Sequence, residues 1–189
     1  MAIKYSGVNL GQIEALLNLI GGEAAIPRIL SGELVVVKRE PPVLDTIIRV
    51  DRSIRPVYPA FVKKVMHPEL EVTGPAQYSL TQVGLWLYPD QRNGVVGNII
   101  YMSLKCDNAL ADHLGLVDLR AIQAKGFVVF RKLFGVKTIF GWRSVVRGHS
   151  VKGRLFVPCL YGTGERVLLH WVRLENRWDD NSPAGRFGK

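Results

Sequence analysis

The sequence predicts an α+β fold, because helical and extended patterns are segregated along the chain instead of alternating as in a doubly wound α/β sheet. Helical patterns occupy residues 9–31 and 108–134, and β-branched runs separated by glycine turns occupy residues 136–174. The chain has 189 residues, of which 48% are hydrophobic and 22% charged. These values are typical of a globular protein that is large enough to bury a full core.

The first predicted element is a helix over residues 9–20. Its apolar residues recur at helical spacing, and they are Ile13, Leu16, Leu17 and Ile20. Asn9 and Gln12 predict a capping box at its start, and a glycine pair follows its end. A second helix is predicted from near Glu23 to Gly32, with Pro27 in its first turn. The chain therefore begins with a helical hairpin.

The middle of the chain is rich in proline. Residues 33–39 and 44–50 predict two strands, because both are rich in β-branched residues and two prolines separate them. Residues 52–75 predict irregular structure apart from a single helix over 59–66, and residues 80–87 and 95–104 predict extended or mixed structure. We expect a domain boundary here, with one domain over 1–51 and the main α+β domain over 52–189; a single continuous domain is the alternative.

The last third predicts a long helix packed on a three-stranded antiparallel meander. A short helix up to Leu114 is followed by a break at Gly115 and a longer helix that ends near Phe134. The predicted strands cover residues 136–147, 154–161 and 166–174, and the connections between them contain glycine, which suits hairpins.

Three stretches resemble a family of small bacterial proteins found largely in candidate-phyla genomes. They are LLNLIGGEAAIPRILSGELVV near the start, VDRSIRPVYPAFVKKVMHPELEVTGPAQYSL in the middle and LGLVDLRAIQAKGFVVFRKLFGVKTIFGWRSVV near the end, the last continued by WVRLENRWDDNSPAGRF. The resemblance implies a bacterial, cytoplasmic protein. The family has no assigned activity, so the resemblance implies no functional residues.

The positive charge of the chain lies almost wholly in its last third. The formal net charge is +9, and residues 120–189 hold 14 basic residues against four acidic ones. The first 119 residues hold 11 basic and 12 acidic residues. A field of this kind attracts polyanions at long range. This predicts a nucleic acid or a ribonucleoprotein as partner; a basic protein without such a partner is the alternative.

The meander supplies the candidate binding residues. Side chains alternate along a strand, so Lys137, Arg143 and Arg147 are expected on one face of the strand that contains them and Trp142 on the other. The predicted phosphate contacts are Lys137, Arg143, Arg147, Lys152, Arg154 and Arg173. Trp171 shares the face of Arg173, where it could stack on a base; packing in the core is the expectation for both tryptophans.

A helix-turn-helix over residues 109–126 is a weaker hypothesis. Its second helix would expose Asp118, Arg120, Gln123 and Lys125 to a major groove. The alanines at its later core positions are small for this motif, which favours an ordinary helical corner.

The sequence contains no catalytic, metal or cofactor motif. The four histidines are isolated, Cys106 and Cys159 lack metal-ligand spacing, and Asp179 with Asp180 fits a solvated turn. A small hydrolase would need His113, His149 or His170 to meet an acid or a nucleophile in a cleft. No secretory signal or membrane span is predicted, so we expect a cytoplasmic protein.

These observations favour a non-enzymatic protein that binds RNA, DNA or a nucleoprotein through its basic C-terminal surface. The alternative is a protein-interaction or assembly module, in which residues 9–31 bind a protein partner or a second copy of the chain. A small hydrolase is the second alternative.

Overall fold

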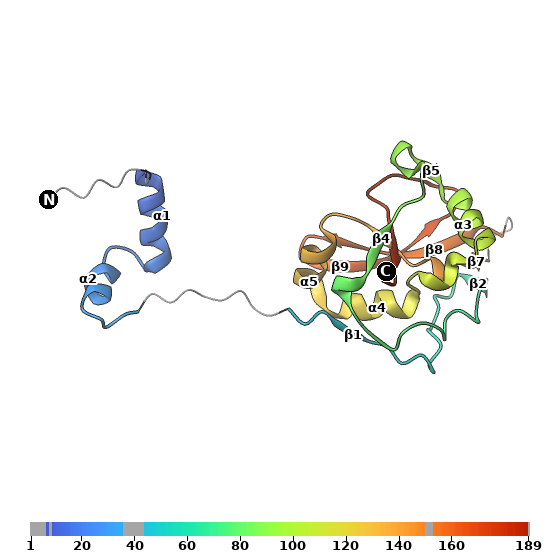
Figure 1. Cartoon of the computed structure of the whole chain (residues 1–189), viewed down its shortest axis with the longest axis horizontal. Coiled ribbons are helices and arrows are strands. Elements are labelled where there is room, and N and C mark those ends of the chain that lie inside the picture. The colour runs from blue at the N-terminus through green and yellow to red at the C-terminus, as the bar shows by residue number, and fades with distance from the viewer. Residues whose placement is uncertain (1–6, 8, 36–43, 150–152, 189) are drawn as a thin grey trace. The chain divides into compact units, whose positions relative to one another are not determined.

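The structure is a computed structural model that describes residues 7, 9–35, 44–149 and 153–188. The chain divides into two compact units, residues 1–43 and residues 44–189 (Figure 1). Each unit is described by itself. The predicted α+β class is confirmed.

The first unit contains two short helices, α1 (Leu10–Ile20) and α2 (Ala25–Leu30). The predicted capping box is present: the Asn9 side chain accepts a hydrogen bond from the Gln12 backbone N–H at 2.9 Å, and the Gln12 side chain accepts one from the Asn9 N–H at 2.9 Å. Gly21 ends α1 in the left-handed region with φ 100°, which a residue without Cβ adopts at little cost. The predicted strand over 33–39 lies mostly outside the described residues, and residues 33–35 form no strand.

The main unit is built on a seven-stranded mixed sheet. Its strands are β2 (Val62–Val65), β4 (Gly84–Trp86), β6 (Ile139–Phe140), β7 (Val146–Gly148), β8 (Leu155–Thr163), β9 (Arg166–Arg173) and β11 (Ala184–Arg186). The order along the sheet is β2, β7, β8, β6, β11, β4, and β9 pairs with β8. The nine-residue strand β8 is the centre, because β9 pairs along one of its edges while β6 and β7 share the other.

Two small sheets lie beside the main one. The pair β1 (Ile47–Arg49) and β3 (Gln77–Ser79) confirms the middle of the strand predicted over 44–50. The second pair is β5 (Val95–Val96) with β10 (Arg177–Trp178). Residues 95–104, predicted to be extended or mixed, contribute β5 and then the helix α3 (Gly97–Cys106).

Two predictions about secondary structure were wrong. Residues 59–66 form no helix, because the β-branched segment Val62–Val65 pairs with β7 as a strand. The strand predicted over 136–147 is interrupted by the 3-10 turn η4 (Trp142–Ser144), which separates β6 from β7. The predicted meander therefore begins with two short strands on one edge of β8 and not with one long strand.

The predicted long helix is two helices, α4 (Leu116–Ala124) and α5 (Gly126–Phe134). Gly126 has φ +84° at the break, a conformation that side-chain-bearing residues rarely adopt. The other 3-10 turns are η1 (Leu80–Gln82), η2 (Gln91–Asn93) and η3 (Ala109–Asp112). The last of these stands where the sequence predicts a short helix before Gly115.

The main sheet is covered on both faces, and each face has its own core cluster. Alternate residues of β8 divide between them: Val157 and Cys159 pack with α3, while Leu160 packs with α4 and α5. Figure 1 shows α4 and α5 close to the long pair β8–β9. Sequence alternation in β8 thus decides which helix covers which face.

The α4–α5 cluster should carry much of the stability. Phe130 on α5 is fully buried in it, whereas Val128 on the same helix is 66% exposed. We predict that Phe130→Ala lowers the free energy of unfolding by about 3–5 kcal/mol, because it removes packed surface and leaves a cavity. The control Val128→Ala should change it by less than about 0.5 kcal/mol. Urea denaturation of both variants checks this, and similar midpoints for the two would contradict it.

Candidate nucleic-acid interface

Cationic side chains gather at one end of the main sheet, on four neighbouring strands. Lys64 on β2 lies opposite Arg147 on β7, Arg154 immediately precedes β8, and Arg173 on β9 lies opposite Phe156. Strands in a sheet lie about 4.8 Å apart, so the four strands span roughly 14 Å. We call Lys64, Arg147, Arg154 and Arg173 the cationic end.

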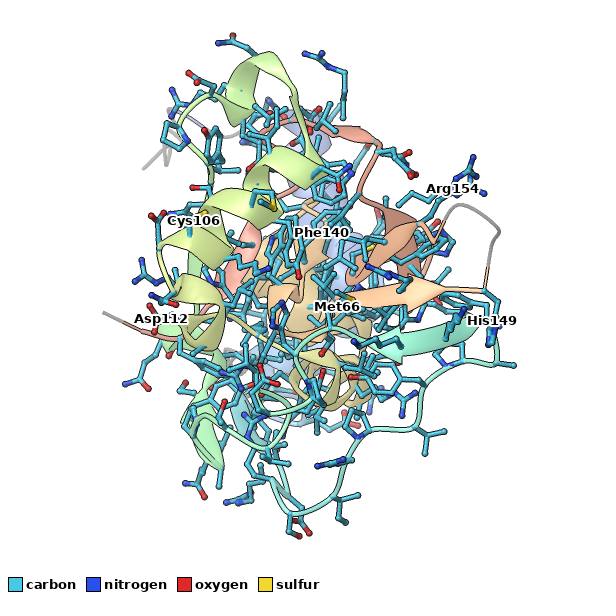
Figure 2. The ribbon with its side chains drawn as sticks, turned by 90° about the vertical axis from the view of Figure 1, so that its right-hand side faces the viewer. Met66, Cys106, Asp112, Phe140, His149 and Arg154 are labelled. Carbon is cyan, nitrogen blue, oxygen red and sulfur yellow. The ribbon has the colours of Figure 1, made fainter. Side chains whose placement is uncertain are left out.

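These cations are little neutralised by the fold. No ion pair is found for Lys64, Arg147 or Arg173 within the described part of the chain. Arg154 lies 3.8 Å from the Glu175 carboxylate, and Figure 2 shows its side chain at the surface on the same side of the main unit as His149. Like charges directly opposite each other, as Lys64 and Arg147 are, disfavour the pairing of their strands. An anion bound there would remove this repulsion.

The cationic end has two faces. Residues opposite each other in a ladder share a face, which puts Arg147 with Lys64 and Leu155, and Arg173 with Phe156. Because Leu155 and Phe156 are adjacent on β8, the two arginines lie on opposite faces of the sheet. The cations thus surround the end of the sheet and do not form the single flat cationic face that strand alternation predicted.

Aromatic rings line a groove on the face of Arg173. Phe61 contacts both Phe156 and Trp171, with ring centroids 5.2 and 5.8 Å apart, and Tyr58 contacts Trp171 at 6.1 Å. The groove has a volume of about 390 Å³, and its lining also includes Gly148, His149, Leu169 and His170. A Cβ on Gly148 would lie 2.9 Å from the Phe156 ring, so only glycine lets this ring lie so close to the strand.

The predicted binding residues have different environments. Arg147 and Arg173 are exposed and Arg154 is half-buried, all at the cationic end. Lys137 lies elsewhere, where its Nζ donates to the Asp180 carbonyl at 3.1 Å. Lys152 lies outside the described residues. Of the two tryptophans expected in the core, Trp142 is buried, whereas Trp171 is partly exposed in the groove.

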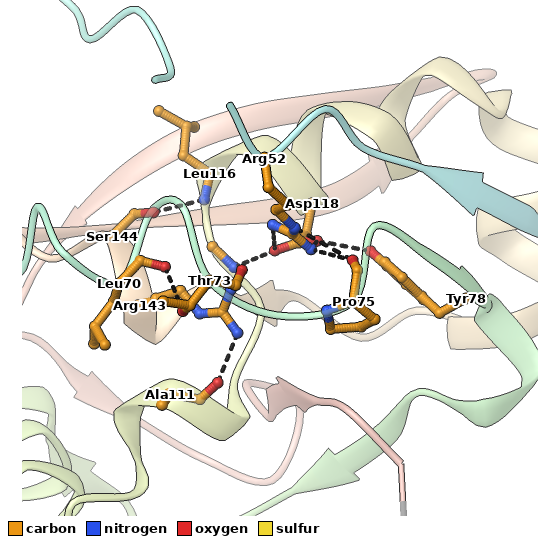
Figure 3. A network of polar contacts seen from close by, with 11 residues as sticks. Arg52, Leu70, Thr73, Pro75, Tyr78, Ala111, Leu116, Asp118, Arg143 and Ser144 are labelled. Atoms are coloured by element: carbon orange, nitrogen blue, oxygen red, sulfur yellow. Dashed lines mark hydrogen bonds and ion pairs between the residues drawn. The ribbon is translucent and has the colours of Figure 1, made fainter. Parts of the chain in front are cut away.

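The expected exposure of Arg143 was wrong. The turn η4 replaces the strand at this position, and the Arg143 side chain is directed into the interior, where it is fully buried. Its guanidinium donates to the Thr73 and Ala111 carbonyl oxygens, each at 2.6 Å (Figure 3). It also lies 5.1 Å from the Phe187 ring centroid. Burial lowers the pKa of this group from its usual value of 12.5. It is part of the interior and not a phosphate contact.

Asp118 joins the same interior network. Its buried carboxylate accepts from Arg52 at 2.6 Å, from the Tyr78 hydroxyl at 3.1 Å and from the Gly115 N–H at 2.9 Å (Figure 3). A fully buried Asp118 cannot face a major groove. The Gln123 side chain donates a hydrogen bond to the Val167 carbonyl, and the Lys125 side chain donates one to Asp45. The helix-turn-helix hypothesis was therefore wrong about the outer face of α4.

Glu71 connects this interior to the groove. Its side chain is 2% exposed, and the Tyr58 hydroxyl donates to one of its oxygens while the ring of Tyr58 contacts Trp171. The other oxygen has no partner among the described residues. Burial raises the pKa of the Glu71 carboxyl above 4.5, and it also raises the pKa of the Tyr58 hydroxyl.

Three members of this site were not predicted from the sequence: Lys64, Tyr58 and Phe61. All three lie in the proline-rich segment that was expected to form irregular structure and one helix. The two valines of Val62–Val65 are three positions apart, which does not by itself indicate a strand, and the distant strand β7 with which the segment pairs cannot be read from its own sequence.

The hydrolase alternative needs a histidine beside an acid or a nucleophile. His113 is buried, with Nδ1 2.8 Å from the Ala109 carbonyl and its ring against Trp86, and burial lowers its pKa. His149 and His170 form no side-chain hydrogen bond or ion pair with a described residue. Burial raises the pKa of the Cys159 thiol to about 12, which makes it a poor nucleophile.

The described residues contain neither a metal-binding cluster nor a membrane-spanning helix. No cluster of three or more histidine, cysteine, aspartate or glutamate side chains arranged to hold a metal ion was found in them. Among those same residues, no helix has the length and apolarity needed to cross a membrane.

The fold and the site together define an α+β protein with an aromatic groove at a cationic sheet end. Comparison with known proteins gave no match to a family model, a curated protein or a solved structure. This agrees with the resemblance to a family without assigned activity. It provides no functional residue to transfer, so the function is argued from the site.

The buried Glu71 predicts a pH dependence of stability. A carboxyl whose pKa is raised in the folded state binds its proton more tightly there than in the unfolded chain, so stability falls as the pH rises from 4.5 through the folded-state pKa. Glu71→Gln removes this titration and keeps an acceptor for Tyr58. We predict that Glu71→Gln becomes more stable relative to the unsubstituted protein over this pH interval.

Urea denaturation between pH 4 and pH 8 measures the difference. The exposed Glu165 provides the control, because Glu165→Gln removes one carboxylate without changing the interior. A constant difference for Glu71→Gln would contradict the prediction.

Proposed function

We propose that this protein binds nucleic acid, RNA or DNA, through phosphate contacts at the cationic end of its main sheet, without catalysing a reaction. The observation that carries the proposal is the cationic end, whose members lie on or beside four adjacent strands. Three of these cations, Lys64, Arg147 and Arg173, have no ion pair within the described residues. Lysine and arginine bind phosphate by releasing its counterions. Arg147, Arg154 and Arg173 are the contacts expected from the sequence, and Lys64 joins them.

The charge distribution supports the same proposal. Elsewhere in the basic C-terminal third, several cations have partners inside the protein: Lys125 with Asp45, Arg186 with Asp112, and Arg177 with the Gly94 carbonyl. Lys64, Arg147 and Arg173 at the sheet end differ from these cations, because no ion pair is found for them within the described residues. A bacterial cytoplasmic location, proposed with this function, also suits the two free cysteines.

The salt dependence of binding tests the proposal. We predict that the triple variant Lys64→Gln, Arg147→Gln, Arg173→Gln binds a mixed-sequence RNA or DNA more weakly. The slope of log K against log salt concentration should fall in magnitude by about 2, since each phosphate contact on a single strand contributes about 0.7. Fluorescence anisotropy at several salt concentrations measures this slope.

A second triple variant gives a control of equal net charge. It is Arg92→Gln, Lys105→Gln, Lys132→Gln, whose three side chains are exposed on other elements. This variant should bind nearly as the unsubstituted protein does. Equal losses in the two triple variants would show that only net charge matters, and no binding at low salt would overturn the proposed function.

A second candidate function is assembly through the helices α1 and α2. No residue of α1 is buried, and the unit exposes large apolar side chains: Leu10, Ile13, Leu16, Leu19, Ile26, Leu30 and Val35. A helix of this length is marginal by itself in water and depends on apolar packing. A protein partner or a second copy of the chain would supply that packing.

Self-association is the version of this function that can be tested with the protein alone. We predict that the full chain shows a mass that increases with concentration and that Leu16→Ser weakens this association. The control is Ile99→Ser on α3, because Leu16 and Ile99 are 58% and 52% exposed. Analytical ultracentrifugation measures the masses. A monomeric full chain at all concentrations would exclude self-association.

A further inference from the structure

Phosphate contacts alone do not account for the aromatic groove beside Arg173. A surface that binds only the phosphate backbone needs cations and no exposed rings. Here four aromatic side chains, Tyr58, Phe61, Phe156 and Trp171, adjoin one another at the same end of the sheet. Phe61 is 37% exposed, and Trp171 and Phe156 are half-buried.

The groove remains open because the two helices on this face stop short of it. The residues of β9 farther along the same face, Leu169 and Val167, pack in the core cluster with α4 and α5, whereas Trp171 and Arg173 have no place in that cluster. The volume of about 390 Å³ lies within the range of about 300–1000 Å³ that is typical of small-molecule sites. A planar group therefore fits there.

The groove and a cation are adjacent on one face. Arg173 lies two residues from Trp171 on β9 and opposite Phe156 on β8, so its side chain and both rings share a face. A nucleotide presents the same two features on either side of its sugar, namely a flat base and an anionic phosphate. Charge complementarity at the rim and aromatic surface inside the groove thus point to one ligand chemistry.

We propose that the groove binds an unstacked base, so that the preferred ligand is single-stranded RNA or DNA and not a duplex. This inference rests on the proposed function and narrows its ligand. Bases in a duplex are stacked on each other and cannot enter the groove, whereas each base of a single strand presents a ring face to Trp171 and Phe61. The site accepts bases with little regard to sequence, because stacking uses a surface that every base has.

Hydrogen bonds beside the groove position its rings. The Tyr58 hydroxyl donates to Glu71, and the Tyr58 ring contacts Trp171. The Phe61 carbonyl accepts a hydrogen bond from the His149 N–H at 3.0 Å, which ties the start of β2 to the end of β7. The rings are thus held in place before a base arrives, which reduces the entropy cost of binding.

The first test uses the unsubstituted full chain and changes only the ligand. We compare a mixed-sequence single-stranded DNA with a DNA of the same length that lacks bases, and with a duplex of the same length, by anisotropy at one salt concentration. The single strand should bind about tenfold more tightly than the abasic strand, because stacking of a base on an aromatic side chain is of this order. It should also quench the fluorescence of Trp171, since Trp142 and Trp178 are buried and the partly exposed Trp86 lies on β4, which β6 and β11 separate from β8.

The second test uses matched variants. Phe61→Ala should weaken single-strand binding about tenfold and leave abasic binding unchanged. Leu168→Ala is the control, because Leu168 is also 37% exposed and lies on the opposite face of β9 from Leu169. Trp171→Phe retains a ring and should keep most of the affinity while it removes the fluorescence quenching.

The outcomes separate the two proposals. Equal binding of the single strand, the abasic strand and the duplex, with the salt dependence intact, would overturn the base-binding groove and leave the phosphate contacts standing. No binding of any of the three would overturn the proposed function. An acidic peptide of equal charge that binds as tightly as the single strand would assign the groove to a protein partner and would also overturn the inference.

Discussion

The structure depends on the burial of a guanidinium group in the interior of the main unit. A buried cation costs several kcal/mol unless acceptors surround it. The two terminal nitrogens of Arg143 donate to the carbonyl oxygens of Thr73 and Ala111, while its Nε has no partner among the described residues. Arg52 reaches into the same region and bonds to Asp118 and the Pro75 carbonyl. These bonds fix segments that have little regular structure of their own, namely residues 70–78 and the start of α4. Glu71 lies in the first of these segments and accepts a hydrogen bond from Tyr58, whose ring contacts Trp171. Buried polar contacts that bind no ligand themselves therefore help to shape the groove at the surface.

The parts of the fold that depend on local sequence could be predicted, and the parts that depend on distant pairing could not. The capping box of α1 and the hairpin β8–β9 follow from residues close together in the chain, and both are present. The strand β2 was predicted as a helix, because its sequence contains lysines and apolar residues that fit either period, and only its partner β7 decides between them. The strands β4 and β11 likewise join the sheet through contacts between residues about 100 positions apart.

The candidate site was predicted in part, and Arg143 shows why the prediction failed where it did. Alternation holds only while a strand continues, and the turn Trp142–Ser144 shifts every later side chain relative to the ones before it. Arg147 was correctly expected to be exposed, but its relation to Arg173 depends on the register between three strands. The sequence showed how much positive charge the last third carries. It could not show which cations the interior would use, because that depends on acceptors far away in the chain, such as the Thr73 and Ala111 carbonyl oxygens for Arg143.

The separation between interior and surface cations changes what the charge asymmetry means. A cation bonded to a carbonyl oxygen or an aspartate is fixed in place, and it contributes to the long-range field without being free to contact a ligand. The exposed cations at the sheet end contribute to the long-range field and can also contact a ligand. Attraction alone would make them bind any polyanion. Selectivity needs a second feature that only some polyanions satisfy. In this protein the feature is the ring surface of Phe61 and Trp171, because it adds free energy only for a ligand with exposed flat groups beside its phosphates. The electrostatic field attracts polyanions to the surface, and the groove increases the affinity only for those that have exposed flat groups.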